Sequence, residues 1–369
     1  MPGKKNKTKM IPMAPEALGF RSGAPSASAS PSNAPVHKKT GAPLIHESLF
    51  RLIHPAVSPA SPIVDTHTHL ALTFQSYRRN YPAGRFETAQ EFVRALYAPA
   101  GVEAMVDVWM EAPVLRIWRE FADSALTAEQ RRDIWGGVEY WFVMGVHPHN
   151  AKFYTDAVEA DIIGAMSHPR CVGWGEMGLD YHYDTSPRPV QRAVFERQLR
   201  CAVRLNKPLT IHSREADDDT ERILKNLVPR DHKIHVHCFT NDPAFAQRLL
   251  DWFPNLFIGI TGVITFSSNK DTSTTVRNMF KPSIAEPRLR IVLETDAPYM
   301  VPSTVYSAPS LTTPEAKGKK LALSHCGVLP WTADFIAGLL PQGNEENERW
   351  DTARVLSLAR ENARAMYGV

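Results

Sequence analysis

The chain has 369 residues, of which 43% are apolar and 22% charged, a composition that is typical of globular proteins and excludes a fibrous or wholly disordered chain. Its formal net charge is +3, but the first 60 residues hold eight basic and only two acidic side chains, so the remainder is net acidic. A globally basic surface that coats nucleic acid is therefore not indicated.

The N-terminal segment differs in composition from the rest of the chain. Residues 21–43 are rich in Ala, Ser and Pro, and such a segment cannot bury enough apolar surface to offset the entropy of ordering. We expect residues 1–60 to form a disordered basic tail and linker. The lysine cluster at residues 4–9 is compatible with a solvated tail or with a nuclear-import signal. The tail is also a candidate docking element for a protein partner.

Two further features bear on location. No stretch approaches the roughly 20 consecutive apolar residues that a membrane-spanning helix needs, and the first residues lack the apolar core of a secretory signal. The four cysteines are scattered, without the two-residue spacing of a zinc knuckle or a redox dithiol. We therefore expect reduced thiols, no membrane association, and a cytoplasmic or nuclear location.

From residue 61 onward, short runs rich in Val and Ile alternate with longer stretches at helical spacing, which is the pattern of a parallel sheet. The clearest helices are expected at residues 190–206 and 351–367, each with apolar side chains along one face. The expected strands are residues 63–65, 102–108, 141–145, 171–175, 209–212, 233–237, 256–260 and 289–294. Eight such units in residues 61–369 predict an α/β fold, a (β/α)8 TIM barrel, with a doubly wound open sheet as the rival.

Histidines and carboxylates gather at the carboxyl ends of five of these strands. His67 and His69, in IVDTHTHL, project to the same side of an extended backbone, although such a pair alone could equally be polar loop residues. The other strand ends carry Glu176, His212, His237 and Asp296. In a barrel all these ends converge on one face, whereas an open sheet would spread them apart. The cluster therefore favours the barrel and predicts a metal site.

The donor types indicate which ions the site would hold. Imidazoles mixed with carboxylates suit borderline divalent ions such as zinc or manganese. There are enough ligands for two ions about 3.5 to 4 Å apart. We expect divalent metal ions, two per subunit, with Zn, Mn and Mg as the candidates.

Several segments of the chain resemble the signature of the TatD family of metal-dependent hydrolases, within the amidohydrolase superfamily. In order between residues 63 and 368 they are IVDTHTHL, GVHPHN, VGWGEMGLDYHYD, QLRCAVRLNKPLTIHSREADDDT, HVHCFTND, IVLETDAPYM and ENARAMYG. The resemblance implies that the metal ligands are His67, His69, Glu176, His212, His237 and Asp296, with Glu176 placed to bridge two ions. It also implies hydrolysis of phosphodiester bonds in DNA by a metal-activated water, as an exonucleolytic deoxyribonuclease.

Two of these ligands are also candidate catalytic residues. Asp296 can accept the proton of the attacking water as well as bind metal, which makes it the candidate general base. Glu176, which would be shared between two ions, is the second candidate catalytic residue. Six further side chains are expected around the ligands or the substrate: Asp65, His147, His149, Asp180, Arg214 and Glu294.

Specific roles are expected for five of these six residues, and Asp180 is expected near the ligands without one. Asp65 would anchor its strand or hold the tautomer of a ligand histidine. His147 and His149 are expected outside the metal shell or at a substrate phosphate. Arg214 would clamp phosphate through its bidentate guanidinium, or form an ordinary surface salt bridge. Glu294 would orient a ligand or be a plain buried strand residue.

The sequence departs from the family pattern after Asp296, where a longer loop intervenes before the next helix. Loops on this face of a barrel set specificity, so the substrate is the open question. His325 and the lysines at 317–320 are candidate phosphate contacts there. The aromatic segment 71–90 could stack bases beside Arg78 and Arg79, or could form a packed flap.

Two alternatives to a nuclease remain. The first keeps the metals and hydrolyses an amide, ester or lactone, which the net acidic barrel mildly favours. The second is a barrel that serves as a protein-interaction scaffold, for which we would expect lost ligands. The complete ligand set argues for an enzyme.

Overall fold

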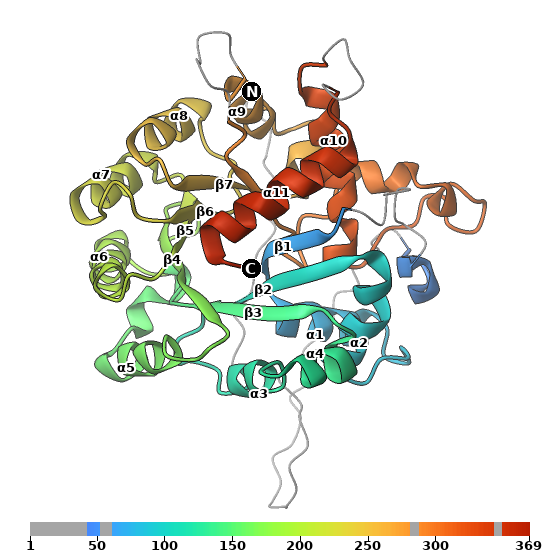
Figure 1. The fold of residues 1–369 in the computed structure, drawn as a ribbon, viewed down its shortest axis with the longest axis horizontal. Coiled ribbons are helices and arrows are strands. Elements are labelled where there is room, and N and C mark those ends of the chain that lie inside the picture. Colours follow the sequence, from blue (N-terminus) through green and yellow to red (C-terminus); the bar gives the residue numbers. More distant parts are fainter. Residues whose placement is uncertain (1–42, 52–60, 281–287, 343–348) are drawn as a thin grey trace, which may run out of the picture. The chain divides into compact units, whose positions relative to one another are not determined.

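The computed structural model describes residues 43–51, 61–280, 288–342 and 349–369. In these residues eight parallel strands form one sheet in sequence order and are surrounded by helices (Figure 1). The strands are β1 Ile63–Thr68, β2 Val102–Trp109, β3 Glu139–Met144, β4 Cys171–Asp180, β5 Leu209–Arg214, β6 Ile234–Val236, β7 Leu256–Ile260 and β8 Ile291–Leu293. The (β/α)8 barrel predicted from the sequence is confirmed.

The seam between β8 and β1 is bridged just beyond the strand ends. The backbone N–H of Asp296 donates to the carbonyl oxygen of His67 (2.9 Å), and that of His69 donates to Ala297 (3.0 Å). The Thr66 hydroxyl donates to the carbonyl oxygen of Leu293 (3.0 Å). These bonds tie the first strand of the barrel to the last.

The helices connect the strands and cover the sheet. They are α1 Leu70–Asn80, α2 Ala89–Leu96, α3 Trp118–Asp123, α4 Ala128–Trp135, α5 Asp156–Ala165, α6 Arg188–Arg204, α7 Asp217–Leu227, α8 Pro243–Trp252, α9 Asp271–Asn278, α10 Leu329–Leu339 and α11 Thr352–Tyr367. Short 3-10 helices lie at Glu47–Arg51, Ala98–Ala100, Pro148–Phe153, Gly262–Thr265, Ser303–Ser307, Pro309–Leu311 and Cys326–Val328. The two helices expected most clearly correspond to α6 and α11. No described helix is long and apolar enough to cross a membrane.

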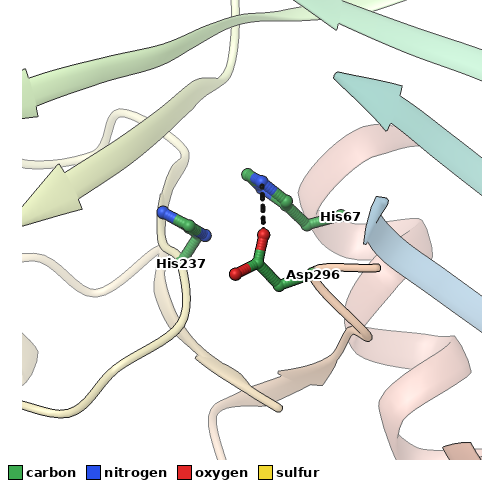
Figure 2. Close-up of side chains that lie close together, drawn as sticks. All are labelled: His67, His237 and Asp296. Carbon is green, nitrogen blue, oxygen red and sulfur yellow. Dashed lines mark ion pairs between the residues drawn. The ribbon is translucent and has the colours of Figure 1, made fainter. Parts of the chain in front are cut away.

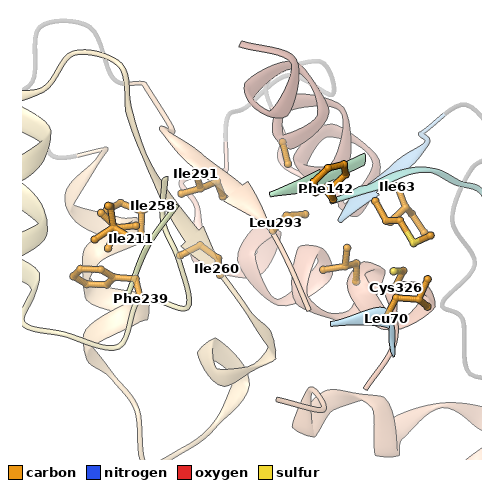
Figure 3. Packing of buried hydrophobic residues seen from close by; sticks show 14 of the residues in the cluster. Ile63, Leu70, Phe142, Ile211, Phe239, Ile258, Ile260, Ile291, Leu293 and Cys326 are labelled. Atoms are coloured by element: carbon orange, nitrogen blue, oxygen red, sulfur yellow. The ribbon is translucent and has the colours of Figure 1, made fainter. Parts of the chain in front are cut away.

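Alternation along the strands separates the core from the site. Residues 209 and 211 of β5 and residues 234 and 236 of β6 are apolar and join the core between sheet and helices. Figure 3 shows Ile211, Ile258 and Phe239 packed together in this layer. The intervening residues are Thr210, His212, His235 and His237, and they face the barrel interior because successive side chains of a strand point to opposite sides.

β4 is longer than expected, since it continues past residue 175 to Asp180. It pairs in parallel with β5, with Gly178 opposite His212 and Asp180 opposite Arg214. Gly178 has φ of +149°, and a Cβ there would overlap with the carbonyl oxygen of His212. Glycine therefore permits the close pairing that carries β4 to the mouth of the barrel.

α11 closes the amino-terminal end of the barrel. Asp351 caps its first turn by accepting a hydrogen bond from Arg354 N–H (2.8 Å), and Gly368 ends it with φ of +80°. Met366 and Tyr367 join a buried cluster with valines of β2, β3 and β8, and Asn362 donates to the carbonyl oxygens of Leu289 (2.8 Å) and Ile291 (2.7 Å) at the start of β8. The helix thereby holds the strand starts together.

Residues 43–51, which the sequence suggests belong to the linker, are part of the barrel unit. Ile45 and Phe50 are fully buried, and Leu44 forms a bridge with Lys320. The Tyr77 hydroxyl donates to the Glu47 carboxylate. Ile45 and Phe50 thus bury apolar surface against the barrel, which stabilises this segment on it. The expected tail at residues 1–42 and linker at 52–60 lie outside the described residues and stay predictions.

The structure decides two expectations for the surface: the phosphate contact of His325 is wrong, and the packed flap at residues 71–90 is confirmed. His325 is fully buried, accepts a hydrogen bond from Gly327 N–H (3.2 Å), and stacks on Tyr97 with ring centroids 5.9 Å apart. It is therefore unable to contact a substrate phosphate. In segment 71–90 the rings of Phe74, Tyr77 and Phe86 are buried against each other. The packed flap, the second of the two interpretations, describes this segment.

Candidate metal centre

Seven histidine and carboxylate side chains meet at the carboxyl end of the barrel. They come from β1 and the residues after it, from the loops after β3, β6 and β8, and from β4 and β5. They are His67, His69, His147, Glu176, His212, His237 and Asp296. Most are buried, His67 completely. The structure thus brings all six expected ligands together, with His147 beside them.

The backbone has an unusual conformation at one donor and directly after another. Asp296, three residues beyond the end of β8, has φ of +50°, and Cys238, directly after His237, has φ of +44°. Residues other than glycine rarely adopt this left-handed conformation, which is found where surrounding structure enforces it, commonly at active sites. These positions follow β6 and β8, the strands after which the donors His237 and Asp296 lie.

Glu176 lies at the centre of the cluster, and its two carboxylate oxygens face different neighbours. Oε1 is 2.7 Å from His237 Nε2, 2.9 Å from His212 Nδ1 and 3.4 Å from His147 Nε2. Oε2 is 3.4 Å from His67 Nε2 and 3.9 Å from His69 Nε2. One carboxylate is therefore shared between two groups of imidazoles.

Asp296 completes the group around His67. Its Oδ1 lies 3.3 Å from His69 Nε2 and 3.8 Å from His67 Nε2. Figure 2 shows His67, His237 and Asp296 directed toward one another from three different parts of the barrel. The rings of His67 and His237 stack with centroids 4.0 Å apart.

The donor set fits divalent cations. Neither ring nitrogen of His67 has a hydrogen-bond partner among the described residues, although the ring is fully buried. A buried polar atom without a partner is costly unless it binds something else. Three groups have ligand atoms within 4.8 Å of one another: His67, His237 and Asp296; His67, His69 and Glu176; His147, Glu176 and His212.

The charge state of the carboxylates suits metal binding. Burial alone would raise the pKa of Glu176, but His237, His147 and His212 hold it well below its usual value. For Asp296, burial is likewise outweighed by the hydrogen bond and charge of His69, so its pKa is lowered. Burial and the neighbouring His237 lower the pKa of His67 to about 4. Two anionic carboxylates and a neutral imidazole are the protonation states that coordinate a cation.

Asp65 anchors strands rather than a histidine ring. The Thr295 hydroxyl donates to its Oδ2 (2.6 Å), and the backbone N–H groups of Thr295 (3.0 Å) and His67 (3.2 Å) donate to its Oδ1. Of the two expected roles, the structure shows the strand anchor, at the seam between β1 and β8.

Asp180 connects two histidines at the edge of the cluster. Its Oδ2 lies 2.8 Å from His149 Nε2 and 3.4 Å from His212 Nε2, while Oδ1 accepts the backbone N–H groups of His182 and Tyr183. A carboxylate on the outer nitrogen of a ligand histidine fixes the orientation of its ring. His149 thus lies outside the donor group, whereas His147, expected outside it, lies within.

Arg214 lies beside the cluster, with its guanidinium 4.9 Å from the ring centroid of Tyr183. Among the described residues no carboxylate is within ion-pairing distance of it, so the alternative of an ordinary salt bridge is not observed. Arg214 also lines a cavity of about 730 Å³, together with Tyr181, residues 215–219 and residues 240–242. Arg214 is the one predicted site residue among the residues that line this cavity.

Two acidic residues near the site were not expected from the sequence. Glu111 follows β2; burial raises its pKa, and His69 opposes that rise. Asp107, inside β2, accepts the backbone N–H of Leu70 (2.8 Å) and the Tyr140 hydroxyl (2.8 Å). The available signal was a ligand-type side chain just after a strand, since Glu111 follows β2 as Asp296 follows β8.

Comparisons with known proteins place these features in context. A family model described as TatD related DNase matches residues 64–368. The human 3'-5' RNA nuclease TATDN2 is 37% identical over 252 residues, which cover 66% of this chain and 29% of that protein. The 3'-5' ssDNA/RNA exonuclease TatD of Klebsiella pneumoniae is 35% identical over 170 residues, 46% of this chain and 62% of that protein. The chain therefore spans less than two thirds of either relative.

Other relatives match at nearly full length. The Bacillus subtilis uncharacterized metal-dependent hydrolase YabD is 27% identical over 310 residues, covering 83% of this chain and 99% of that protein. The crystal structure of YJJV, a TatD homologue from Escherichia coli, superposes with a TM-score of 0.61 at 20% identity, covering 84% of this chain and 99% of that one. At that identity the likeness supports the fold alone.

Proposed function

Because this chain belongs to the TatD family of metal-dependent hydrolases, we propose that it hydrolyses phosphodiester bonds of nucleic acid at the candidate metal centre. The observation that carries the proposal is the position of Glu176, whose two oxygens face two separate groups of imidazoles. A shared carboxylate of this kind suits a pair of cations on either side of a phosphate.

We assign one ion to each side of Glu176. The first would be held by His67, His69 and Asp296, and the second by His147, His212 and His237. When bound, divalent cations lower the pKa of water and neutralise charge on phosphate oxygens. Imidazole-rich sites favour zinc or manganese, and magnesium remains a third candidate.

Three side chains of the protein have proposed roles in the reaction besides those of the metal ions, and the first is Asp296. Its carboxylate is held anionic by His69 and is the candidate general base, because it can accept a proton from the attacking water. Arg214, unpaired with any described carboxylate, is positioned to bind a phosphate of the substrate through its fork of N–H donors. Asp180 would keep His212 directed at Glu176.

The substrate class is inferred from the relatives. One is named as an exonuclease of single-stranded DNA and RNA and another as an RNA nuclease, both with 3'-5' direction. We propose that this chain shortens single-stranded DNA or RNA from an end, with DNA as the substrate expected from its sequence. We also propose a cytoplasmic or nuclear location and a docking role for the N-terminal segment.

The charge near the site favours one alternative. Five carboxylates line the cavity beside Arg214: Glu215, Asp217, Asp218, Asp219 and Asp242. Arg78, one of the two arginines expected to lie beside stacked bases, instead donates to the carbonyl oxygens of Gly84 and Phe86, and Arg188 at the start of α6 pairs with Asp184. An acidic wall disfavours a long polyanion, so hydrolysis of an amide, ester or lactone is the second candidate function.

The test is hydrolysis of end-labelled single-stranded DNA and RNA with magnesium, manganese or zinc. Glu176→Ala and Asp296→Ala are compared with Glu129→Ala and Asp133→Ala, which remove exposed carboxylates on α4. Shortening from one end that is lost in the first pair and kept in the second supports a nuclease. Intact nucleic acid under every metal, with cleavage of amide or ester substrates, would establish the alternative instead.

A further inference from the structure

Beneath the donor cluster, four buried polar side chains form a continuous series of contacts. The hydroxyl of Tyr367, at the end of α11, lies 2.7 Å from Thr210 Oγ1 and 2.9 Å from His235 Nδ1. On the opposite side of the imidazole, His235 Nε2 lies 2.8 Å from Glu294 Oε2. The series links the helix that closes one end of the barrel with β5, β6 and the residue after β8.

The upper end of this series reaches the metal centre. The Cys238 backbone N–H donates to Glu294 Oε1. Cys238 directly follows the donor His237 and has the left-handed φ of +44°. Glu294 therefore holds the backbone turn from which the His237 ring extends, and His237 Nε2 ends 2.7 Å from Glu176 Oε1.

The neighbouring strand leaves room for this arrangement. A Cβ at Gly259 of β7 would overlap with both His235 Nε2 and Glu294 Oε1. His235 and Glu294 are also fully buried. Buried polar groups are frequently less stabilising than apolar side chains of similar volume, although in some proteins they specify one geometry. The room left by Gly259 and the contacts of His235 and Glu294 suit a role in specifying one geometry.

We infer that Tyr367, His235 and Glu294 form a positioning column that fixes the direction of His237 and so strengthens metal binding. The inference rests on the proposed metal centre. It assigns a function to α11 beyond closing the barrel, because the Tyr367 hydroxyl is the lower support of the column. Groups that orient a metal ligand in this way typically contribute 10-fold to 100-fold in metal affinity.

The first test removes the lower support. Tyr367→Phe keeps the ring and deletes the hydroxyl, and Tyr81→Phe is its matched control because that hydroxyl donates to the carbonyl oxygen of Ile45 (2.8 Å), away from the donors. Metal affinity is measured with zinc by competition against a chromophoric chelator. The absorption spectrum of the cobalt-loaded protein reports the ligand geometry.

We expect Tyr367→Phe to weaken zinc binding about tenfold and to change the cobalt spectrum, with Tyr81→Phe like the wild type. Equal affinity and an unchanged spectrum in Tyr367→Phe would overturn the inference while leaving the proposed function in place. A wild-type chain that binds no metal would overturn both.

The second test acts at the upper end and does not depend on the folding of the first variant. Glu294→Gln retains an oxygen that can accept the Cys238 N–H and an amide that can face His235, whereas Glu294→Leu retains only volume. Zinc affinity within about threefold of wild type in Glu294→Gln, with a loss of about tenfold or more in Glu294→Leu, supports the column. Equal affinities in the two variants would show that Glu294 merely fills space.

Discussion

Asp107 offers a quantitative test of the electrostatics around the site. Its carboxylate accepts the N–H of Leu70, the residue after His69, and is completely buried. Burial raises its pKa to about 6, and the hydrogen bond from Leu70 only partly opposes this. The folded state therefore prefers protonated Asp107, and the stability this confers at low pH is lost as the pH rises from 3.8 through 6.

The magnitude follows from these two values. A carboxyl group with a pKa of 3.8 when unfolded and about 6 when folded lowers the free energy of unfolding by about 1 kcal/mol at pH 4.5 and about 3 kcal/mol at pH 7.5. Asn cannot ionise, and its oxygen can still accept the Leu70 N–H. The stability of Asp107→Asn relative to wild type should therefore increase by about 2 kcal/mol between these pH values.

The assay is urea unfolding followed by tryptophan fluorescence, with a chelator present so that metal binding does not contribute. Asp133→Asn, which changes an exposed carboxylate on α4, is the control and should show no such trend. A stability difference between Asp107→Asn and wild type that stays constant from pH 4.5 to 7.5, within about 0.5 kcal/mol, would refute the reasoning.

Three further predictions concern the metal centre, the substrate and the core. Glu176→Gln keeps one acceptor oxygen instead of two, so metal analysis should give about two ions per chain for the wild type and about one for the variant; two ions retained in the variant would contradict the shared-carboxylate geometry. Arg214→Lys removes the bidentate fork, so KM for an oligonucleotide should rise about tenfold while cleavage of a small phosphodiester stays within about threefold; a parallel loss on both substrates would argue against a phosphate contact. Ile211→Ala, in the fully buried core, should lower the free energy of unfolding by about 2 to 5 kcal/mol in urea, and a change below about 1 kcal/mol would show that the layer repacks.

The fold was accessible from the sequence because its main signals are local. Strand runs and helical stripes alternate along the chain, and Asp351 and Gly368 bound α11 as caps do. The placement of ligand-type residues at strand ends then selected a barrel over an open sheet. The ends of individual strands were less accessible, since β4 continues to Asp180 through pairing with β5 that depends on Gly178.

The site could be predicted only in part from the sequence, because its geometry depends on contacts between residues far apart in the chain. Residue type and spacing bring His67, His69 and Glu176 to notice, but not the direction of each ring. His147 joins the donors through the path of the loop after β3, and His325 is buried by residues 92 and 97 far from it in sequence. Arg214 and Asp65 each had two candidate roles, and only three-dimensional neighbours could distinguish them.

The seam between β8 and β1 has a consequence for how the protein matures. Asp65 and Thr295, joined by two hydrogen bonds, are separated by 230 positions in the chain, and His67 and Asp296 meet across the same seam. Such distant contacts form late, since the intervening loop must first be closed. A ribosome-bound or truncated chain that lacks β8 therefore has no complete centre. Metal binding at this centre would therefore be restricted to molecules whose barrel has closed, and it would favour the closed state.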